Sequence, residues 1–333
     1  MSILLELKSK CKGFYEKNYK IVRPLLRFVL AFVCYLLIFN CLRIGDEPVV
    51  LLIPFVLAAI STFLPDISIV YISAALAAGK VFEISSVLGI AMAVIFIVIF
   101  LMVGRYDSSQ LFIILAIPLC SIFHVSYVVP IVSAIFVGPA VLPAILLGIV
   151  IRYIFMGIIA AMSAPSLSVE AYGSVEMFQF VVNSLIKNRE MILCMIAFVI
   201  SYGVTYLIRK QKANHATQLA ILMGSFAMIV TVLFGNIIMK GTVDIPQFAV
   251  GMLISVVVAY IIQFFRMTLD YTGVINLQFE DDEYYYYVKA VPKLKVTIKD
   301  KTITRINPKE DENEVDNLQE EFDKVFKEEN ERD

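Results

Sequence analysis

The sequence predicts an all-α polytopic membrane protein of about ten transmembrane helices, followed by a small cytosolic β-hairpin and an amphipathic helix. Three observations carry this prediction. Of 333 residues, 59% are hydrophobic and 17% are charged, against about 45–50% and about 25% in soluble domains. Between Val125 and Met162 the only formal charge is that of Arg152, and two membrane-spanning helices broken at Gly138 and Pro139 account for this stretch. Residues 1–273 carry 18 Lys and Arg against 12 Asp and Glu, whereas residues 274–333 carry 10 against 17.

The amino-terminal segment 1–27 is basic, with seven Lys and Arg against two Glu. It leads into an apolar run from Phe28 to Leu42 that ends without a small-residue cleavage site. We therefore expect a retained first span and a cytosolic amino terminus, because positive charge flanking a span stays inside.

The transmembrane domain is expected to cover residues 28–273. After the first span, nine further apolar runs are candidate spans: 48–64, 66–82, 85–103, 109–124, 126–138, 140–163, 191–208, 217–239 and 245–266. Threading them from the inside puts the basic loops on the cytoplasmic face of the cell membrane and returns the carboxyl terminus there. Spans 66–82 and 126–138 are short, so one of them is a candidate re-entrant segment.

The prolines fall into two groups. Pro139 and Pro143 are expected to mark the start of a span, whereas Pro118 and Pro130 are candidates for helix breaks that line a cavity.

Segment 164–190 is expected to be an outer loop that contains an amphipathic helix on the membrane surface. Its apolar residues at helical spacing are Val175, Phe178, Val182, Leu185 and Ile186. The helix is either a structural lid on the bundle or a gate over a cavity.

The tail divides at Asn307. Residues 274–306 are rich in Tyr, Val, Thr and Ile and alternate from Leu294 onward, which predicts two short strands with a turn near Lys299 to Thr302. Residues 307–333 predict an acidic amphipathic helix. Its apolar stripe, which packs on its own domain or binds a cytosolic protein, consists of Val315, Leu318, Phe322, Val325 and Phe326.

Motifs for chemistry are missing from the sequence. It has two His and no HExxH, no Cys and His cluster and no GxxxxGK[ST], so we expect no metal, no cofactor, no enzymatic activity and no nucleic-acid partner. The five Cys show no paired spacing and are expected to be buried free thiols. The acidic run from Glu280 to Glu283 is interpreted as solvated, since four consecutive acids do not converge on one ion without a dedicated loop.

Arg152 is the candidate functional residue. It lies near the middle of its predicted span, where an arginine costs about 2.5–3.5 kcal/mol, and no Asp or Glu is expected deep inside a span to pair with it. Ala140, Ala144 and Gly148 lead toward it on one helix face, which indicates a face packed against other helices. The candidate partners are His124, Asn236 and Gln263. Arg152 either snorkels or caps carbonyls, or it attracts an anionic group of a solute or lipid, in which case His124 and Asn236 complete the ligand site.

Two resemblances accompany these patterns. The stretch FEDDEYYYYVKAVPKLKV resembles a tail found in a family of uncharacterised bacterial multi-pass membrane proteins, some of which are labelled transporter permease. The stretch FVGPAVLPAILLGIVIRY is similar to part of the membrane module shared by substrate-binding subunits of energy-coupling vitamin transporters and the rod-shape membrane protein. The second resemblance implies a membrane module of about six spans and assigns no ligand residue.

The sequence therefore leaves two main functional interpretations. One is a permease-like protein that handles a small anionic solute or lipid and binds a partner through its tail. The other is a non-catalytic scaffold of cell-envelope assembly that recruits proteins through its tail. A membrane-embedded enzyme is the least supported, because no catalytic residues converge at membrane depth.

Overall fold

The structure is a computed structural model that describes residues 10, 13–15, 17–42, 51–103, 108–163, 175–211, 215–241, 243–266, 275–280 and 285–290. The chain divides into two compact units, Met1–Leu294 and Lys295–Asp333. The second unit lies outside the described residues, as do the predicted turn near Lys299 and the apolar stripe of the predicted tail helix.

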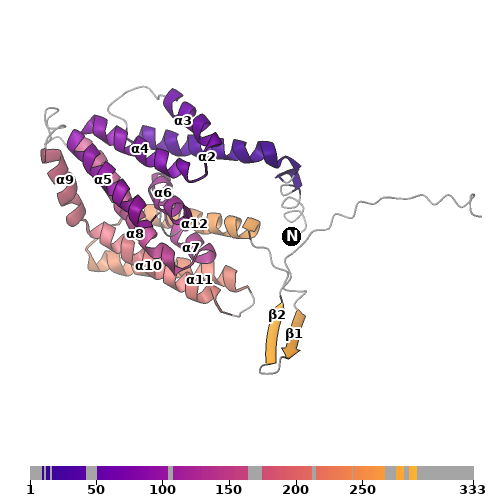
Figure 1. Ribbon diagram of the computed structural model, residues 1–333. Coiled ribbons are helices and arrows are strands. Elements are labelled where there is room, and N and C mark those ends of the chain that lie inside the picture. The colour runs from indigo at the N-terminus through magenta and orange to yellow at the C-terminus, as the bar shows by residue number, and fades with distance from the viewer. Residues whose placement is uncertain are drawn as a thin grey trace, which may run out of the picture. The chain divides into compact units, whose positions relative to one another are not determined.

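The first unit is a helical bundle in which each of the ten predicted apolar runs contains a helix (Figure 1). The helices are α2 (Tyr19–Cys41), α3 (Leu52–Phe63), α4 (Ser68–Ile84), α5 (Ser86–Val103), α6 (Ser108–Ile122), α7 (Val128–Phe136), α8 (Leu142–Met162), α9 (Val175–Ile186), α10 (Arg189–Arg209), α11 (Ala216–Ile238) and α12 (Ile245–Arg266). A 3-10 turn, η1 (Pro139–Val141), precedes α8.

Within the described part of the chain, five helices are long and apolar enough to cross a membrane. They are Tyr19–Cys41, Pro139–Met162, Arg189–Arg209, Ala216–Ile238 and Ile245–Arg266. The chain is thus an α-helical membrane protein, and the prediction of about ten crossings is not shown by this measure. The nine residues of α7 reach only about 14 Å, so segment 126–138 is too short to cross a hydrocarbon core of about 30 Å.

Some of the prolines occupy the positions predicted for them and others do not. Pro139 and Pro143 occupy the first turns of η1 and α8, where the missing N–H would have no helical partner. Pro130 lies in the first turn of α7 and breaks nothing. Pro118 lies inside α6. Because proline has no N–H, the Ile114 carbonyl one turn earlier has no helical donor at this position, and Gly148 of α8 packs beside that carbonyl.

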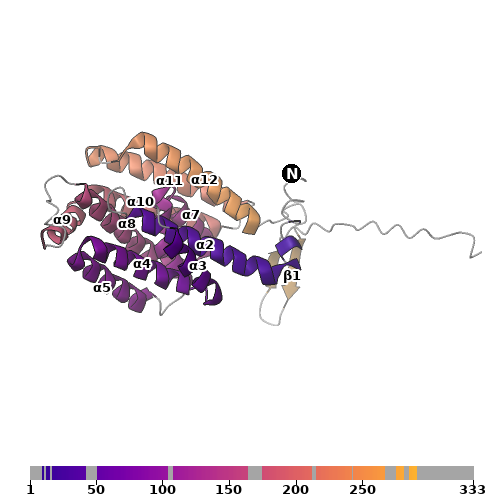
Figure 2. The same cartoon turned by 90° about the horizontal axis from the view of Figure 1, so that it is seen from above.

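Helices α10, α11 and α12 lie side by side in both views (Figures 1 and 2). The closest contact is at Gly224, where a Cβ atom would lie 1.8 Å from the Thr205 Oγ1. Ser201 Oγ donates a 3.0 Å hydrogen bond to the Gly224 carbonyl. Small and hydroxyl side chains therefore hold this pair of helices together, as is usual in membranes, where apolar packing alone gives little specificity.

Helices α8 and α10 run in opposite directions. The Tyr202 hydroxyl of α10 donates to the Val137 carbonyl just before α8, and the Tyr153 hydroxyl of α8 donates to Glu190 at the start of α10. Helices α6 and α8 run in the same direction, since Ile117 of α6 lies against Gly148 and later residues of both helices line one cavity. The beginnings of α6 and α8 therefore lie at the same end of the bundle as the end of α10.

Basic side chains gather at that end, which we call the basic end. Arg209 Nη1 donates a 3.0 Å bond to the Ala134 carbonyl and so caps the carboxyl-terminal end of α7, and the Arg266 guanidinium lies nearby, 4.3 Å from the Phe136 ring centre. Arg27 at the beginning of α2 lines a hollow together with Phe112 at the beginning of α6. The described basic residues of this end are Lys17, Lys20, Arg23, Arg27, Arg209, Lys210 and Arg266.

The turn between α6 and α7 is a Schellman motif. His124 has a φ of 57°, Val125 N donates to the Cys120 carbonyl over 2.9 Å, and His124 N donates to the Ser121 carbonyl over 3.0 Å. Gly251 of α12 packs on this turn so closely that a Cβ atom there would lie 2.3 Å from the His124 oxygen. The turn is therefore packed against α12 by backbone contact.

Helix α9 presents the predicted apolar stripe to the bundle only in part: Phe178 and Leu185 of the stripe pack against the core. Met177 and Val181 are its buried residues, and Val181 lies against Gly157 of α8. Val175 and Ile186, which belong to the predicted stripe, are 57% and 72% exposed. The helix has apolar side chains on more than one face, so periodicity alone did not identify the face that packs on α8.

The β-rich segment contains one hairpin in its described part. Strands β1 (Ile275–Glu280) and β2 (Tyr285–Ala290) pair antiparallel, with Ile275 opposite Ala290 and Glu280 opposite Tyr285. The strands lie earlier in the chain than the alternating run from Leu294 that led to the predicted turn. The run of Tyr in β2 suits a strand because aromatic side chains favour the pleated conformation.

Candidate functional site

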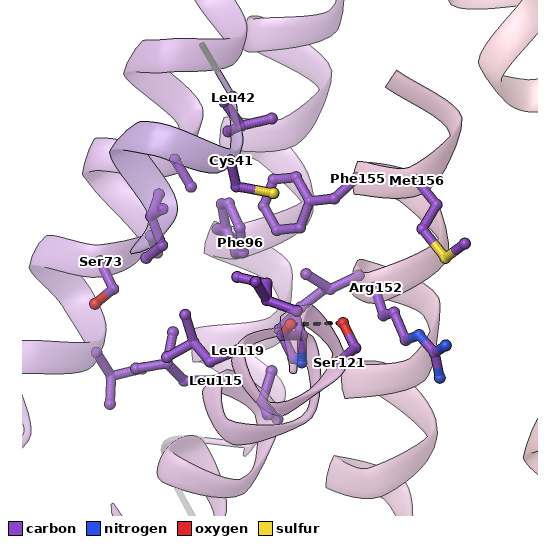
Figure 3. A pocket seen from close by; sticks show the side chains of 18 of the residues that line it. Cys41, Leu42, Ser73, Phe96, Leu115, Leu119, Ser121, Arg152, Phe155 and Met156 are labelled. Atoms are coloured by element: carbon purple, nitrogen blue, oxygen red, sulfur yellow. Dashed lines mark hydrogen bonds between the residues drawn. The ribbon is translucent and has the colours of Figure 1, made fainter. Parts of the chain in front are cut away.

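The bundle encloses a cavity of about 260 Å³, which we call the apolar cavity (Figure 3). It lies among α2, α4, α5, α6 and α8, and its lining is almost entirely hydrocarbon. The lining residues are Ile38, Cys41, Leu42, Val70, Ser73, Ala74, Ala77, Phe96, Ile99, Phe100, Ile114, Leu115, Pro118, Leu119, Ser121, Ile122, His124, Ile151, Arg152, Phe155, Met156 and Ile159.

The few polar groups in this lining are mostly engaged within the chain. Ser121 Oγ donates a 2.6 Å bond to the Pro118 carbonyl, drawn as the dashed line in Figure 3. The His124 ring lies 2.9 Å from the Gln247 amide nitrogen through its Nε2. The Ser73 hydroxyl is buried without a hydrogen-bond partner within the described part of the chain. The apolar cavity therefore offers few polar partners to a bound molecule.

The cavity reaches the surface beside α6 and α8. Four of its lining residues are also exposed: Ile122 (37%), Met156 (45%), Ile159 (37%) and His124. The first three belong to the end of α6 and the second half of α8. Apart from His124 this rim is apolar, so an apolar molecule can reach the cavity from the bilayer past Met156 and Ile159 without crossing a polar surface.

Arg152 lines the apolar cavity only with its aliphatic stem. Figure 3 shows its guanidinium directed away from Leu119, Ser121 and Phe155, on the far side of α8. The charged end lies in a second group of residues, which we call the polar cluster. Its members are Ser126, Arg152, Tyr153, Glu190 and Cys194.

The polar cluster compensates the buried arginine. Arg152 Nη1 donates a 3.3 Å bond to Ser126 Oγ and lies 3.9 Å from Cys194 Sγ. The guanidinium carbon lies 5.2 Å from the centre of the Tyr153 ring, a favourable cation–π arrangement. The Tyr153 hydroxyl in turn donates a 3.0 Å bond to Glu190 Oε1. A carboxylate thus lies one side chain away from the arginine.

A cavity of about 20 Å³ lies beside the polar cluster and is lined by Arg152, Tyr153 and Glu190. One water molecule requires about 10–15 Å³ and two to four polar partners, so this space fits a water. Arg152 Nε, which is buried and has no protein partner among the described residues, is a donor available to it. The cluster is therefore a locally satisfied internal site without room for a solute.

The prediction that Arg152 points into the bundle is confirmed, and Ala144 and Gly148 on the same face are buried. Ala140, the third residue of that face, is exposed. The predicted partners of Arg152 were wrong. Asn236 Oδ1 instead accepts a 2.9 Å bond from Val243 N at the α11–α12 turn, His124 contacts Gln247, and Gln263 is buried in α12.

The prediction that no acid lies deep inside a span to pair with Arg152 is not contradicted, but it missed an acid at the start of a helix, Glu190, which reaches the polar cluster through Tyr153. The predicted span began at residue 191, whereas α10 begins at Arg189 and includes Glu190 in its first turn. Asn188 caps the helix by accepting a 3.0 Å bond from Met191 N. An Asn followed by an acidic first turn is a start signal that the sequence already contained.

The depth assigned to Arg152 changes as well. Tyr153 lies halfway along the 21 residues of α8, yet it contacts the second residue of α10. Val243, which precedes α12, also lines the small cavity beside the cluster. Arg152 is therefore central in α8 but lies near the ends of α10, α11 and α12, where an arginine costs less than at mid-membrane.

The cysteines in the described ranges are unpaired, as predicted. Cys34, Cys41, Cys120 and Cys194 are free thiols of intermediate exposure. No group of three His, Cys, Asp or Glu side chains in those ranges is close enough to hold a metal ion.

No protein-family model, curated protein or solved structure matches this chain. The two resemblances stated above therefore stay predictions.

Proposed function

We propose that this chain is an integral membrane protein that binds a lipid-like molecule in the apolar cavity, in a permease-like role. The observation that carries the proposal is the combination of a cavity of about 260 Å³ with a hydrocarbon lining and an exposed apolar rim at Met156 and Ile159. Pockets of this kind take apolar ligands and use a few polar groups for orientation.

Between the two substrate classes, a lipid fits better than a small anionic solute. An anion needs an available cation or several N–H donors in a dry site. The only formally charged residue of the lining is Arg152, and its guanidinium lies in the polar cluster near Glu190. The acyl or isoprenyl part of a lipid needs no such partner.

Native mass spectrometry of the purified full chain tests the proposal through lipids that remain bound after detergent exchange. Ala77→Phe introduces a ring into the cavity from α4, and its matched control is Ala75→Phe, on the exposed side of the same helix. We expect Ala77→Phe to lose a retained lipid that wild type and Ala75→Phe both keep. Equal retention in all three proteins would contradict the proposal.

The basic end supports an orientation. Asp66 is the single described acid there, and it pairs with Arg23 and Arg27. The excess of Lys and Arg favours a position of the basic end on the cytoplasmic side of the cell membrane. Both the beginning of α2 and the end of α12 belong to it, in keeping with cytoplasmic amino and carboxyl termini. Cysteine labelling of intact cells after placing a Cys at position 20 or 210 tests this; labelling from outside would contradict it.

The second part of the proposal is that the tail binds a cytosolic protein. The alternative function, a scaffold of cell-envelope assembly, rests on the same binding. The stripe from Val315 to Phe326 has the spacing of a helix that docks on a cytosolic protein. Deleting residues 307–333 is expected to abolish capture of a partner while leaving membrane insertion and the retained lipid unchanged. If the deletion removes the lipid instead, the tail serves the bundle rather than a partner.

A further inference from the structure

A second hollow lies at the basic end of the bundle, apart from the apolar cavity. It has a volume of about 300 Å³ and lies among α2, α4 and α6. Its polar side is formed by Arg23, Arg27 and Asp66, and its apolar side includes Leu26, Leu30 and Phe112. The hollow is thus amphiphilic, with a charged part and a hydrocarbon part next to each other.

The charged residues that line this hollow, two Arg and one Asp, carry one net positive charge. Arg27 pairs with Asp66, and Arg23 Nη2 lies 3.8 Å from the other oxygen of the same carboxylate. Two guanidinium groups therefore share one acid. Arg23 Nη1 also donates to the Tyr19 hydroxyl, but the Arg23 side chain is 45% exposed, so its other donors are accessible from outside.

Arg23 and Arg27 lie where the apolar part of α2 begins, which is the depth at which lipid phosphates are expected. Arg27 directly precedes the uncharged apolar run from Phe28 to Leu42, and arginines at such a boundary extend toward the interface. Leu26 and Leu30 on the same part of α2 are 55% and 51% exposed. A lipid phosphate beside the guanidinium groups would place its acyl chain along these leucines.

We propose that Arg23 and Arg27 bind the phosphate of an anionic phospholipid whose acyl chain lies along Leu26, Leu30 and Phe112. Guanidinium groups bind phosphate oxygens through charge-assisted hydrogen bonds. The net positive charge favours an anionic lipid over a zwitterionic one, whose cationic headgroup adds no attraction. This site does not depend on a ligand in the apolar cavity.

The test uses the purified full chain in detergent, offered equal amounts of phosphatidylglycerol and phosphatidylcholine with identical acyl chains, with bound lipids counted by native mass spectrometry. Wild type is expected to prefer phosphatidylglycerol. The variant Arg23→Gln/Arg27→Gln is expected to lose this preference, by about fivefold for each charge removed. The control Lys17→Gln/Lys20→Gln removes the same charge from exposed positions of the same segment that do not line the hollow, and it is expected to keep the preference.

Asp66→Asn distinguishes a lipid site from a plain ion-pair network. Removing the competing carboxylate is expected to raise phosphatidylglycerol binding, and this readout remains informative if the double arginine variant does not fold. A decrease with Asp66→Asn, an equal loss in the lysine control, or no preference in wild type would overturn the proposal. Displacement of the lipid by millimolar inorganic phosphate would overturn it too, because the site would then take a free anion. The variant Ala77→Phe is expected to leave the preference unchanged, which separates this site from the apolar cavity.

Discussion

The Tyr153 hydroxyl donates a 3.0 Å hydrogen bond to Glu190 and thereby joins the middle of α8 to the first turn of α10. The same tyrosine ring carries the Arg152 guanidinium on its face. One aromatic side chain thus links a buried cation to a carboxylate, and the polar cluster can be treated as one energetic unit.

Tyr153→Phe removes the hydroxyl and keeps the ring. Glu190 then loses its donor, and the free energy of unfolding is expected to fall by about 0.5–1.5 kcal/mol, as for a half-buried hydrogen bond that is removed. Thermal unfolding in detergent measures the effect. The double variant Tyr153→Phe/Glu190→Gln is expected to recover part of the loss; an additive further loss would show that the two groups are not coupled.

Arg152→Gln separates the two interpretations of the arginine. Because the guanidinium lies in the polar cluster, the variant is expected to lower stability by about 1–3 kcal/mol while retaining the lipid of the apolar cavity. Unfolding temperature and native mass spectra, recorded on the same sample, give both quantities. A fully stable variant that no longer retains lipid would assign Arg152 to the ligand site instead.

His124 is expected to affect the stability of the fold through its left-handed backbone conformation and not through its side chain. Asn tolerates the left-handed region, whereas a β-branched residue does not, so His124→Val should destabilise the α6–α7 turn by about 1–3 kcal/mol and His124→Asn by clearly less. Thermal unfolding of the two variants measures the difference. If His124 were instead a ligand residue, both variants would lose the retained lipid equally and keep their stability.

Gly251→Ala tests the contact between α12 and the same turn. The new Cβ would lie 2.3 Å from the His124 oxygen, and neither backbone can move away easily, so the variant is expected to be clearly less stable than wild type. Gly203→Ala in α10 is the control, because nothing lies within 4 Å of its new Cβ. There alanine should stabilise the helix by about 0.5–1 kcal/mol. Equal unfolding temperatures for the two variants would contradict the packing described.

Much of the helical architecture follows from sequence, and the reason is local. Apolar runs bounded by Gly, Pro and charged residues gave the positions of the helices, and Pro139 and Pro143 gave the start of α8. Periodicity contains no information on how far one helix is shifted along another. The shift that brings Glu190 beside Tyr153 was therefore missed, although Asn188 already indicated that α10 begins early.

The apolar cavity could not be predicted for a related reason. A cavity results from side chains of five helices that leave space between them, and each of these helices is simply apolar in sequence. His124 was singled out as a polar residue in a membrane segment, and its left-handed backbone was not expected because His is not the usual residue there. The hollow with Arg23 and Arg27 was overlooked because both residues were interpreted only as topology signals.

The short helix α7 has a consequence for how the chain is assembled during synthesis. Nine residues are too few to be held in the bilayer as a separate segment, and the two cations that contact its end, Arg209 on a carbonyl and Arg266 on the Phe136 ring, are made much later. We therefore expect α7 to reach its final position during synthesis only after α10 and α12 have been inserted. A nascent chain stalled before residue 266 would carry an incompletely seated α7, and its sensitivity to protease should disappear only when α12 is complete.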